Sequence, residues 1–147
     1  MKALDIDDQS APAHHTLAIV FQQEREFDLA ESYFKRAIAL APEMIAVRNN
    51  FGAFLYAQGR PVEAVDQLTI ATEDRFYELR PQAFENLAVA YLALENRSAA
   101  RDAFERAEAL NPRLPRTLLE LTLLHLEDQN YTAAKALYLR HRAIARQ

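Results

Sequence analysis

The same residue types recur along this chain at a spacing close to 34 residues, and this period limits the fold more than any other feature. Alanine recurs at Ala30, Ala64, Ala100 and Ala134, with spacings of 34, 36 and 34 residues. A large residue follows each alanine four positions later, at Phe34, Leu68, Phe104 and Tyr138. Such self-similarity is typical of repeat proteins, in which each repeat is one supersecondary unit that stacks on its neighbours. The repeats are therefore placed at 11–44, 45–78, 81–114 and 115–147, with a two-residue insertion at Leu79 and Arg80.

Each repeat contains two stretches whose apolar residues have helical spacing, separated by a short polar turn. The expected turns lie at Glu24–Glu26, Gln58–Arg60, Glu95–Arg97 and Asp128–Asn130. Only two glycines and six prolines occur in 147 residues, so few strand turns are possible, and the abundant Ala, Leu, Glu and Arg favour helix. We therefore predict an all-α fold, in which a single domain over 1–147 forms an α-solenoid of helix–turn–helix repeats with a right-handed superhelical twist.

Both glycines lie in one stretch, NNFGAFLYAQGRPVEA at residues 49–64, and each needs a structural reason. Glycine costs about 1 kcal/mol in a helix interior relative to alanine. Gly52 shares its position in the repeat with three other small residues, Ala18, Ala88 and Thr122. We expect Gly52 to let the two helices of its repeat approach closely, and the Thr122 hydroxyl to bond a carbonyl oxygen one turn earlier. Gly59 lies in a polar turn and is expected to supply the turn conformation.

The first ten residues resemble the end of a second helix. Ala3, Leu4 and Ile6 lie 34 residues before Ala37, Ile38 and Leu40. Residues 1–10 are therefore interpreted as the end of a truncated preceding repeat whose partner helix lies upstream. The alternative is a short N-terminal cap.

The sequence carries no motif of a catalytic, metal or nucleotide site. It has no cysteine, which excludes disulfides, thiolate metal ligands and cysteine nucleophiles. It contains no GxSxG, no HExxH and no glycine-rich phosphate loop. His14 and His15 are adjacent and would point about 100° apart on a helix. A net charge of -4 gives no general nucleic-acid footprint. We therefore expect a protein that is not an enzyme, needs no cofactor and binds no nucleic acid.

The period and the helix–turn–helix pattern resemble the tetratricopeptide repeat, and the resemblance covers almost the whole chain. In such a solenoid the first helices of the repeats line the concave wall. The residues expected to face this partner-binding groove are Asn49, Asn50, Tyr56, Asn86, Val89, Leu92, Leu119, Leu123 and Leu126. For the apolar members of this set the alternative is burial in the core, because helical spacing is the same in both cases.

Asn50 and Asn86 occupy the same position in successive repeats. In tetratricopeptide proteins that bind peptides, asparagines at this position often contact the peptide backbone, and the resemblance implies that role here. The alternative is that each asparagine bonds a neighbouring helix. The groove lacks the clustered lysines and arginines with which tetratricopeptide co-chaperones hold a terminal carboxylate, which argues against an adaptor of that kind. The last helix, expected from Tyr131 to Ala145, is interpreted as a solubilising cap, with contact to an acidic partner or anionic lipid as the alternative.

A narrower resemblance rests on particular residues. The stretch NNFGAFLYAQGRPVEA, the spaced Asp74, Tyr77 and Arg80 at the insertion, and the run FENL at residues 84–87 are similar to the PilF/PilW family of type IV pilus biogenesis proteins. Members of that family are outer-membrane lipoproteins with six tetratricopeptide repeats. They act as pilotins, which help the pilus secretin to reach the outer membrane and assemble its ring. The resemblance implies a protein on the periplasmic side of the outer membrane, with a signal peptide and a lipidated cysteine upstream of this sequence.

The resemblance also implies a function. The expected function is that of a non-catalytic adaptor, which binds a secretin subunit through the groove and shields an apolar segment of it until the ring forms. Contact with the membrane is expected only through a lipid anchor that this chain does not contain, because no apolar run approaches the roughly 18 residues of a membrane span. Two alternatives stay open: a tetratricopeptide scaffold of another envelope complex, and the regulatory module of a larger enzyme.

Overall fold

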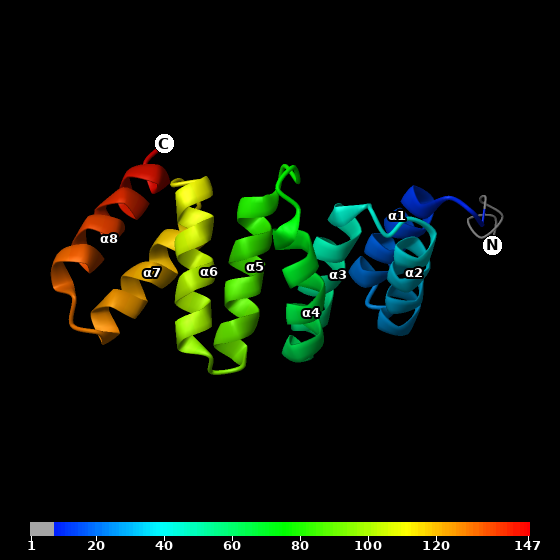
Figure 1. Ribbon diagram of the computed structural model, residues 1–147, viewed down its shortest axis with the longest axis horizontal. Helices are drawn as coiled ribbons and strands as arrows, with labels where there is room; N and C mark the ends of the chain where they lie inside the picture. The colour runs from blue at the N-terminus through cyan, green and yellow to red at the C-terminus, as the bar shows by residue number, and fades with distance from the viewer. Residues whose placement is uncertain (1–7) are drawn as a thin grey trace.

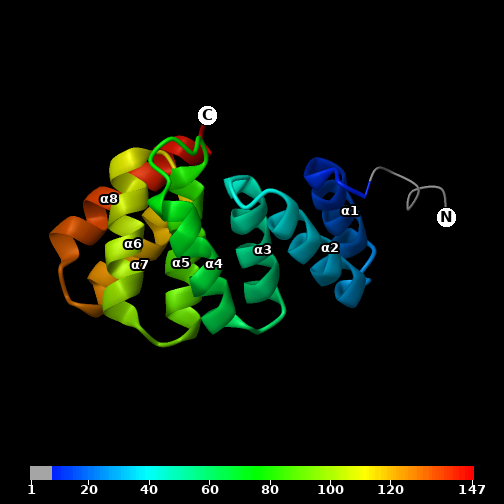
Figure 2. The same cartoon turned by 45° about the vertical axis from the view of Figure 1, so that its right-hand side comes forward.

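The protein is an elongated stack of helices. The structure, a computed structural model, describes residues 8–147, and within them it contains eight α-helices and no strand. The helices are α1 (Ala11–Gln23), α2 (Phe27–Leu40), α3 (Ile45–Ala57), α4 (Pro61–Glu73), α5 (Arg80–Ala93), α6 (Arg97–Leu110), α7 (Pro115–Glu127) and α8 (Tyr131–Ala145). They follow one another along the long axis, with α1 and α2 at one end and α7 and α8 at the other (Figures 1 and 2). The predicted all-α solenoid is confirmed, whereas the interpretation of residues 1–10 falls mostly on residues outside the described part.

The helices pair in chain order, and small residues lie where each pair meets. The pairs are α1 with α2, α3 with α4, α5 with α6 and α7 with α8, and successive pairs pack on each other. The recurring alanines Ala30, Ala64 and Ala100 are fully buried, and so are the large residues Phe34, Leu68 and Phe104 that follow them. Because a buried alanine lets two helix backbones approach, the adjacent large side chain can fill the space between repeats. The period read from the sequence therefore corresponds to the packing of the core.

Gly52 of α3 faces the fully buried Leu68 of α4. A Cβ atom added at Gly52 would lie 2.5 Å from Leu68 Cγ and 2.7 Å from its Cδ2. Any side chain at this position would therefore overlap Leu68 unless Leu68 moved, which agrees with the prediction that a close contact between α3 and α4 requires Gly52. The predicted bond of Thr122 is also confirmed, because its hydroxyl donates to the Leu118 carbonyl oxygen at 2.7 Å.

The turns within the four repeats share one left-handed residue. The residues with positive φ are Arg25 (63°), Gly59 (75°), Glu95 (59°) and Gln129 (61°). In each turn the next backbone N–H donates to the carbonyl oxygen five residues earlier, as Arg60 N–H does to Leu55 at 2.9 Å. This bond closes the preceding helix with the Schellman arrangement, in which glycine is the preferred left-handed residue. The expected role of Gly59 is confirmed.

The third turn lies one residue earlier than predicted. Arg97, which was expected to end this turn, is the first residue of α6. Asn96 precedes it as the N-cap, and its side-chain oxygen accepts a bond from the Ala99 backbone N–H at 3.2 Å. Asparagine is a preferred N-cap residue, so the helix begins directly after it.

Replacing Gln129 with glycine is expected to raise the free energy of unfolding by about 1 kcal/mol, because a side chain at a left-handed residue costs about that much. Gln129 is exposed, so the change removes little packing. The reverse change, Gly59→Ala, is expected to lower the free energy of unfolding by a similar amount. Urea denaturation of the two variants and the parent measures both effects. Equal stability of all three proteins would contradict the role given to these turns.

Ion pairs link neighbouring repeats at two junctions, and the member on the second helix has the same position in both. Arg60, in the turn after α3, donates to both carboxylate oxygens of Glu31 on α2, at 2.6 and 3.0 Å. Arg101 on α6 pairs with Asp128, which lies just after α7. Glu31 and Arg101 occupy the same position in repeats one and three. The second helix of one repeat is therefore joined to the turn of the next by opposite charges, and the order of the charges is reversed between the two junctions.

The Arg60–Glu31 pair is expected to make stability depend on pH below about pH 4.5. The hydrogen bonds from Arg60 lower the pKa of Glu31 from 4.5 to about 2. A carboxylate with a lowered pKa contributes its full stabilisation above its unfolded pKa and loses it as the pH falls through the folded value. The difference in free energy of unfolding between the parent and Glu31→Gln should therefore shrink as the pH falls from about 4.5 to about 2. A difference that stays constant from neutral pH through this window would contradict the assignment.

Candidate functional site

The most exposed apolar stripe on a first helix lies on α7. Leu119, Leu123 and Leu126 recur at spacings of four and three residues, so they share one face of that helix. Their side chains are 39%, 45% and 45% exposed, respectively. We call these three residues the leucine stripe. A row of exposed leucines on one helix face costs solubility unless a partner covers it.

A hollow of about 340 Å³ lies beside this stripe, between α5 and α7. Its apolar lining comes from Leu92 on α5 and from Leu123 and Leu124 on α7. Leu92 is half-buried, and Leu124 belongs to the core. The leucine stripe therefore borders a depression rather than a flat surface, which suits a side chain inserted by a partner.

Tyr56 lies on α3, two repeats from the leucine stripe, and is 38% exposed. Two other residues expected in the groove have little surface: Asn49 is 5% exposed and Val89 is 4% exposed. Val89 belongs to the hydrophobic core, so it is buried and does not face the groove. The accessible apolar residues are therefore Tyr56, Leu92 and the leucine stripe.

The asparagines bond to neighbouring repeats. The Asn50 amide donates to His15 Nε2 on α1 at 2.8 Å. Burial lowers the pKa of His15, which keeps the ring neutral at pH 7 and able to accept this bond. The Asn86 amide donates to Asn49 Oδ1 at 3.0 Å, and the Asn49 amide donates to the Tyr77 hydroxyl at 3.2 Å. Burial also raises the pKa of Tyr77. Two roles were considered for Asn50 and Asn86: contact with a peptide backbone and a hydrogen bond to a neighbouring helix. The structure contains the hydrogen bonds to neighbouring helices.

Acidic residues edge the hollow, and the sequence placed only one of them on the groove side. Glu95, Glu120 and Glu127 line it together with the leucines. Arg97 is the only base in this lining, and it is engaged by Glu127 Oε2 at 2.7 Å and Asp128 Oδ1 at 2.9 Å. The rim is therefore acidic around an apolar floor. Glu120 has the same position in its repeat as Asn50 and Asn86, so the period places it on the groove side, whereas nothing in the sequence marked Glu95 and Glu127.

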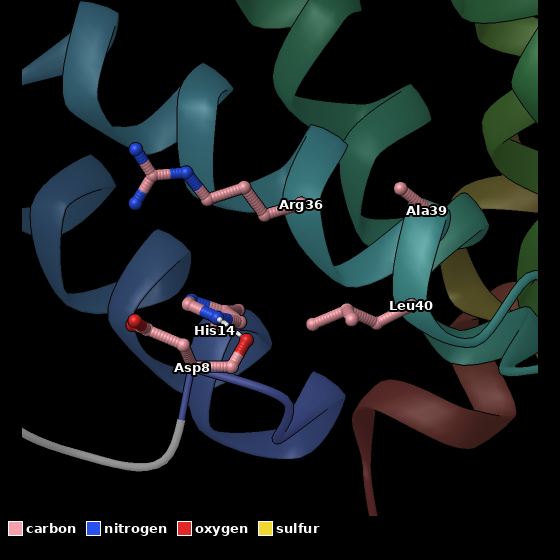
Figure 3. Close-up of a pocket in the computed structure, with 5 residues that line it drawn as sticks. All are labelled: Asp8, His14, Arg36, Ala39 and Leu40. Atoms are coloured by element: carbon pink, nitrogen blue, oxygen red, sulfur yellow. Dashed lines mark hydrogen bonds between the residues drawn. The ribbon is translucent and has the colours of Figure 1, made fainter.

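A second hollow, of about 420 Å³, lies at the other end of the molecule (Figure 3). It is lined by Asp8, His14, Arg36, Ala39 and Leu40, and the His14 Nε2 atom lies 3.0 Å from the Asp8 carbonyl oxygen. None of the residues expected in the groove lines it. Among residues 8–147 no group of three or more histidines or carboxylates is placed to hold a metal ion. The groove side of the first helices is therefore the site that the predicted residues describe.

Comparison with known proteins identifies repeats along almost the whole chain. The profile of the tetratricopeptide repeat family matches residues 15–83 and 85–147. The type IV pilus assembly protein PilF of Pseudomonas aeruginosa is 39% identical over 137 residues, which are 93% of this chain and 54% of that protein. This chain thus spans just over half of that relative's length.

Solved structures agree with this similarity. The structure of Pseudomonas aeruginosa PilF superposes with a TM-score of 0.92 at 36% identity, over 95% of this chain and 63% of that one. The structure of PilW, described as a widely conserved type IV pilus biogenesis factor, gives a TM-score of 0.85 at 21% identity, over 98% of this chain and 66% of that one. At 21% sequence identity, the similarity to PilW shows a common fold and nothing more. Within residues 8–147, the helices all lack the length and apolar character needed to cross a membrane.

Proposed function

This chain belongs to the tetratricopeptide repeat family, and from that premise we propose that it is a non-catalytic adaptor of type IV pilus assembly. Its similarity to PilF supports the assignment to pilus assembly. In finer detail, the proposed role is that of a pilotin, which binds a secretin subunit and assists its localisation and ring assembly at the outer membrane. The chain would then act on the periplasmic side of that membrane, as part of a lipoprotein.

The observation that carries the proposal is the leucine stripe beside its hollow. Partner binding is usually dominated by a few apolar anchors in a desolvated pocket, surrounded by a polar rim. Leu92, Leu123 and Leu124 supply such a floor, and the glutamates supply the rim. Leu119 lies on the same face of α7 as Leu123 and extends the exposed apolar surface beside the hollow. The proposed ligand is therefore an apolar segment of the secretin subunit. Asn50 and Asn86 support the site indirectly, because their bonds fix the first helices relative to one another.

Binding of the purified pilus secretin subunit to the double variant Leu119→Ser, Leu123→Ser tests this proposal. Each apolar anchor is worth about 1 kcal/mol or more, so the double change is expected to weaken binding at least about tenfold. The matched control is Leu29→Ser, Leu110→Ser, which alters two leucines of similar exposure (45% and 47%) on the second helices α2 and α6. The control should bind as the parent does, and circular dichroism should show both variants folded.

Two results would go against the proposal. Equal affinity of the stripe variant, the control and the parent would refute the leucine stripe as the binding surface. The parent protein could fail to bind the secretin and instead bind another envelope protein through the leucine stripe. That result would assign the chain to the wider class of tetratricopeptide scaffolds.

A further inference from the structure

A third hollow, of about 640 Å³, lies between α4, α5 and α6 in the middle of the stack. It is lined by Thr69, Thr72, Glu73, Arg75, Arg80, Phe84, Leu87, Tyr91 and Arg106. None of the residues predicted for the partner-binding groove belongs to this lining. The lining contains three bases and one acid, and we call it the arginine hollow.

The two-residue insertion between repeats two and three contributes to this hollow. The connection from α4 to α5 covers residues 74–79, whereas those from α2 to α3 and from α6 to α7 cover 41–44 and 111–114. In Figure 1 the longer connection lies at the same edge of the stack as the end of α6. The insertion therefore supplies Arg80 and lengthens the segment that supplies Arg75.

Two of the guanidinium groups are held over one aromatic ring. The guanidinium carbon of Arg80 lies 5.3 Å from the centroid of the Phe84 ring, and that of Arg106 lies 4.9 Å from it. Such contacts attract a cation to the face of the ring. The Arg80 Nε–H also donates to the Thr72 carbonyl oxygen at 2.7 Å, a bond that uses one of its three side-chain nitrogens. Because Phe84 is 4% exposed, two like charges are fixed beside a buried ring.

These charges have no acidic partner within the described part of the chain. Among residues 8–147, none of the three arginines of the hollow takes part in an ion pair. Arg60 and Arg101, by contrast, each pair with a carboxylate of a neighbouring repeat. Like charges held close together repel each other, and a bound anion relieves this repulsion. A carboxylate can also accept two parallel bonds from one guanidinium group. The arginine hollow therefore favours an anionic ligand.

The size and lining of the hollow distinguish between kinds of anion. Its volume is much larger than that of a single carboxylate or phosphate group, and it includes Leu87 and the half-buried Tyr91. An apolar or aromatic side chain next to the anionic group would cover these two residues. A surface of anionic lipid headgroups fits less well, because Glu73 lines the hollow and Asp74 and Glu78 lie in the adjacent connection. A protein segment that carries carboxylates beside an apolar side chain fits all of these features.

We propose that the arginine hollow binds an acidic segment of a partner protein. The carboxylates of the segment bond to Arg75, Arg80 and Arg106, and a neighbouring aromatic or apolar side chain lies against Leu87 and Tyr91. Arg75 and Arg106 are exposed and Arg80 is half-buried, so a ligand can reach all three. The hollow shares no residue with the leucine stripe, so this proposal does not depend on the function proposed above.

An NMR titration of the ¹⁵N-labelled full chain with the end-blocked peptide EEYEE tests the proposal. Concentrations up to about 5 mM include the Kd of about 1 mM that a few charge-assisted bonds would give. The peptide should shift the amide signals of Thr72, Arg80 and Phe84 in a saturable way, and the neutral peptide QQYQQ should bind at least about tenfold more weakly. The double variant Arg75→Gln, Arg106→Gln should bind EEYEE about tenfold or more weakly than the parent, because two cations are lost.

The matched control is Arg116→Gln, Arg142→Gln, which removes the same charge from two exposed arginines outside the hollow. Arg142 lies over the Tyr138 ring, much as Arg106 lies over Phe84, so the control also removes one ring contact. The control should bind EEYEE as the parent does, and circular dichroism should show both double variants folded. Arg75→Gln alone removes no contact with Phe84 and should still weaken binding about threefold.

Four results would overturn the proposal. The first is the absence of a saturable shift with EEYEE. The second is an equal loss of affinity in the control variant, which would show attraction to the overall charge of the protein. The third is equal affinity for inorganic phosphate and EEYEE, which would identify a site for small anions. The fourth is arginine-dependent binding to vesicles that contain phosphatidylglycerol without binding of EEYEE, which would identify a membrane contact.

Discussion

Replacing Gly52 with valine is expected to lower the free energy of unfolding by about 3 kcal/mol. Even a bare Cβ atom at this position would lie 2.5 Å from Leu68 Cγ, and Leu68 is fully buried. Overpacking of a core typically costs about 1–3 kcal/mol, and the branched side chain of valine falls at the upper end of that range. The gain in helix propensity over glycine recovers less than about 1 kcal/mol of this loss. Urea denaturation followed by circular dichroism measures the difference from the parent.

A second substitution tests whether Leu68 is the cause. Leu68→Ala alone is expected to cost about 2–5 kcal/mol, because it opens a cavity in the core. In that background Gly52→Val should cost less than about 1 kcal/mol, because valine then enters the vacated space. Ala57→Val, at an exposed position of the same helix, controls for propensity and should change stability by about 0.5 kcal/mol or less. Equal costs of Gly52→Val in both backgrounds would show that Leu68 is not the obstacle.

The fold was predictable because the repeat period records the packing of the core. Ala30, Ala64 and Ala100 are fully buried at the same place in three helix pairs, so the spacing of one residue type was enough to divide the chain into repeats. The turns were predictable only in part. Gly59 indicated a left-handed residue, but Arg25 and Glu95 adopt the same conformation without being glycine. Their conformation is imposed by the bond that closes the preceding helix, which depends on the backbone and not on the residue type.

The candidate site was harder to predict, because exposure and hydrogen-bond partners depend on how the repeats are placed. Val89 and Leu123 have the same position in successive repeats, yet Val89 is 4% exposed and Leu123 is 45% exposed. The sequence also did not indicate the chain of bonds from Asn86 through Asn49 to Tyr77. Tyr77 lies in the segment 74–79, which the two-residue insertion makes longer than the other connections between repeats. The Asn86–Asn49 bond joins two repeats, and the Asn49–Tyr77 bond joins residues 28 positions apart, so local sequence pattern does not encode either contact.

The contact of Glu85 with Thr117 also joins two repeats and was not indicated by the sequence pattern. Replacing Glu85 is the second substitution expected to lower stability strongly. The Glu85 Oε2 atom on α5 accepts bonds from the Thr117 backbone N–H at 3.0 Å and from the Thr117 hydroxyl at 2.5 Å. Thr117 is fully buried and lies in the first turn of α7, where backbone N–H groups lack partners within the helix. A carboxylate at a helix N-terminus also interacts favourably with the helix dipole. One side chain of the third repeat therefore supplies the cap of the helix that carries the leucine stripe.

Glu85→Ala is expected to lower the free energy of unfolding by about 2–3 kcal/mol, because it leaves two buried donors of Thr117 without an acceptor. Glu85→Gln retains an acceptor oxygen at the same place and should lose less than half as much. In a Thr117→Val background, where the hydroxyl is already gone, Glu85→Ala should cost about 1 kcal/mol less than in the parent. Guanidinium denaturation of the four variants gives these values. Equal losses for Glu85→Ala and Glu85→Gln would show that side-chain packing, and not the two hydrogen bonds, makes Glu85 matter to the junction of α5 and α7.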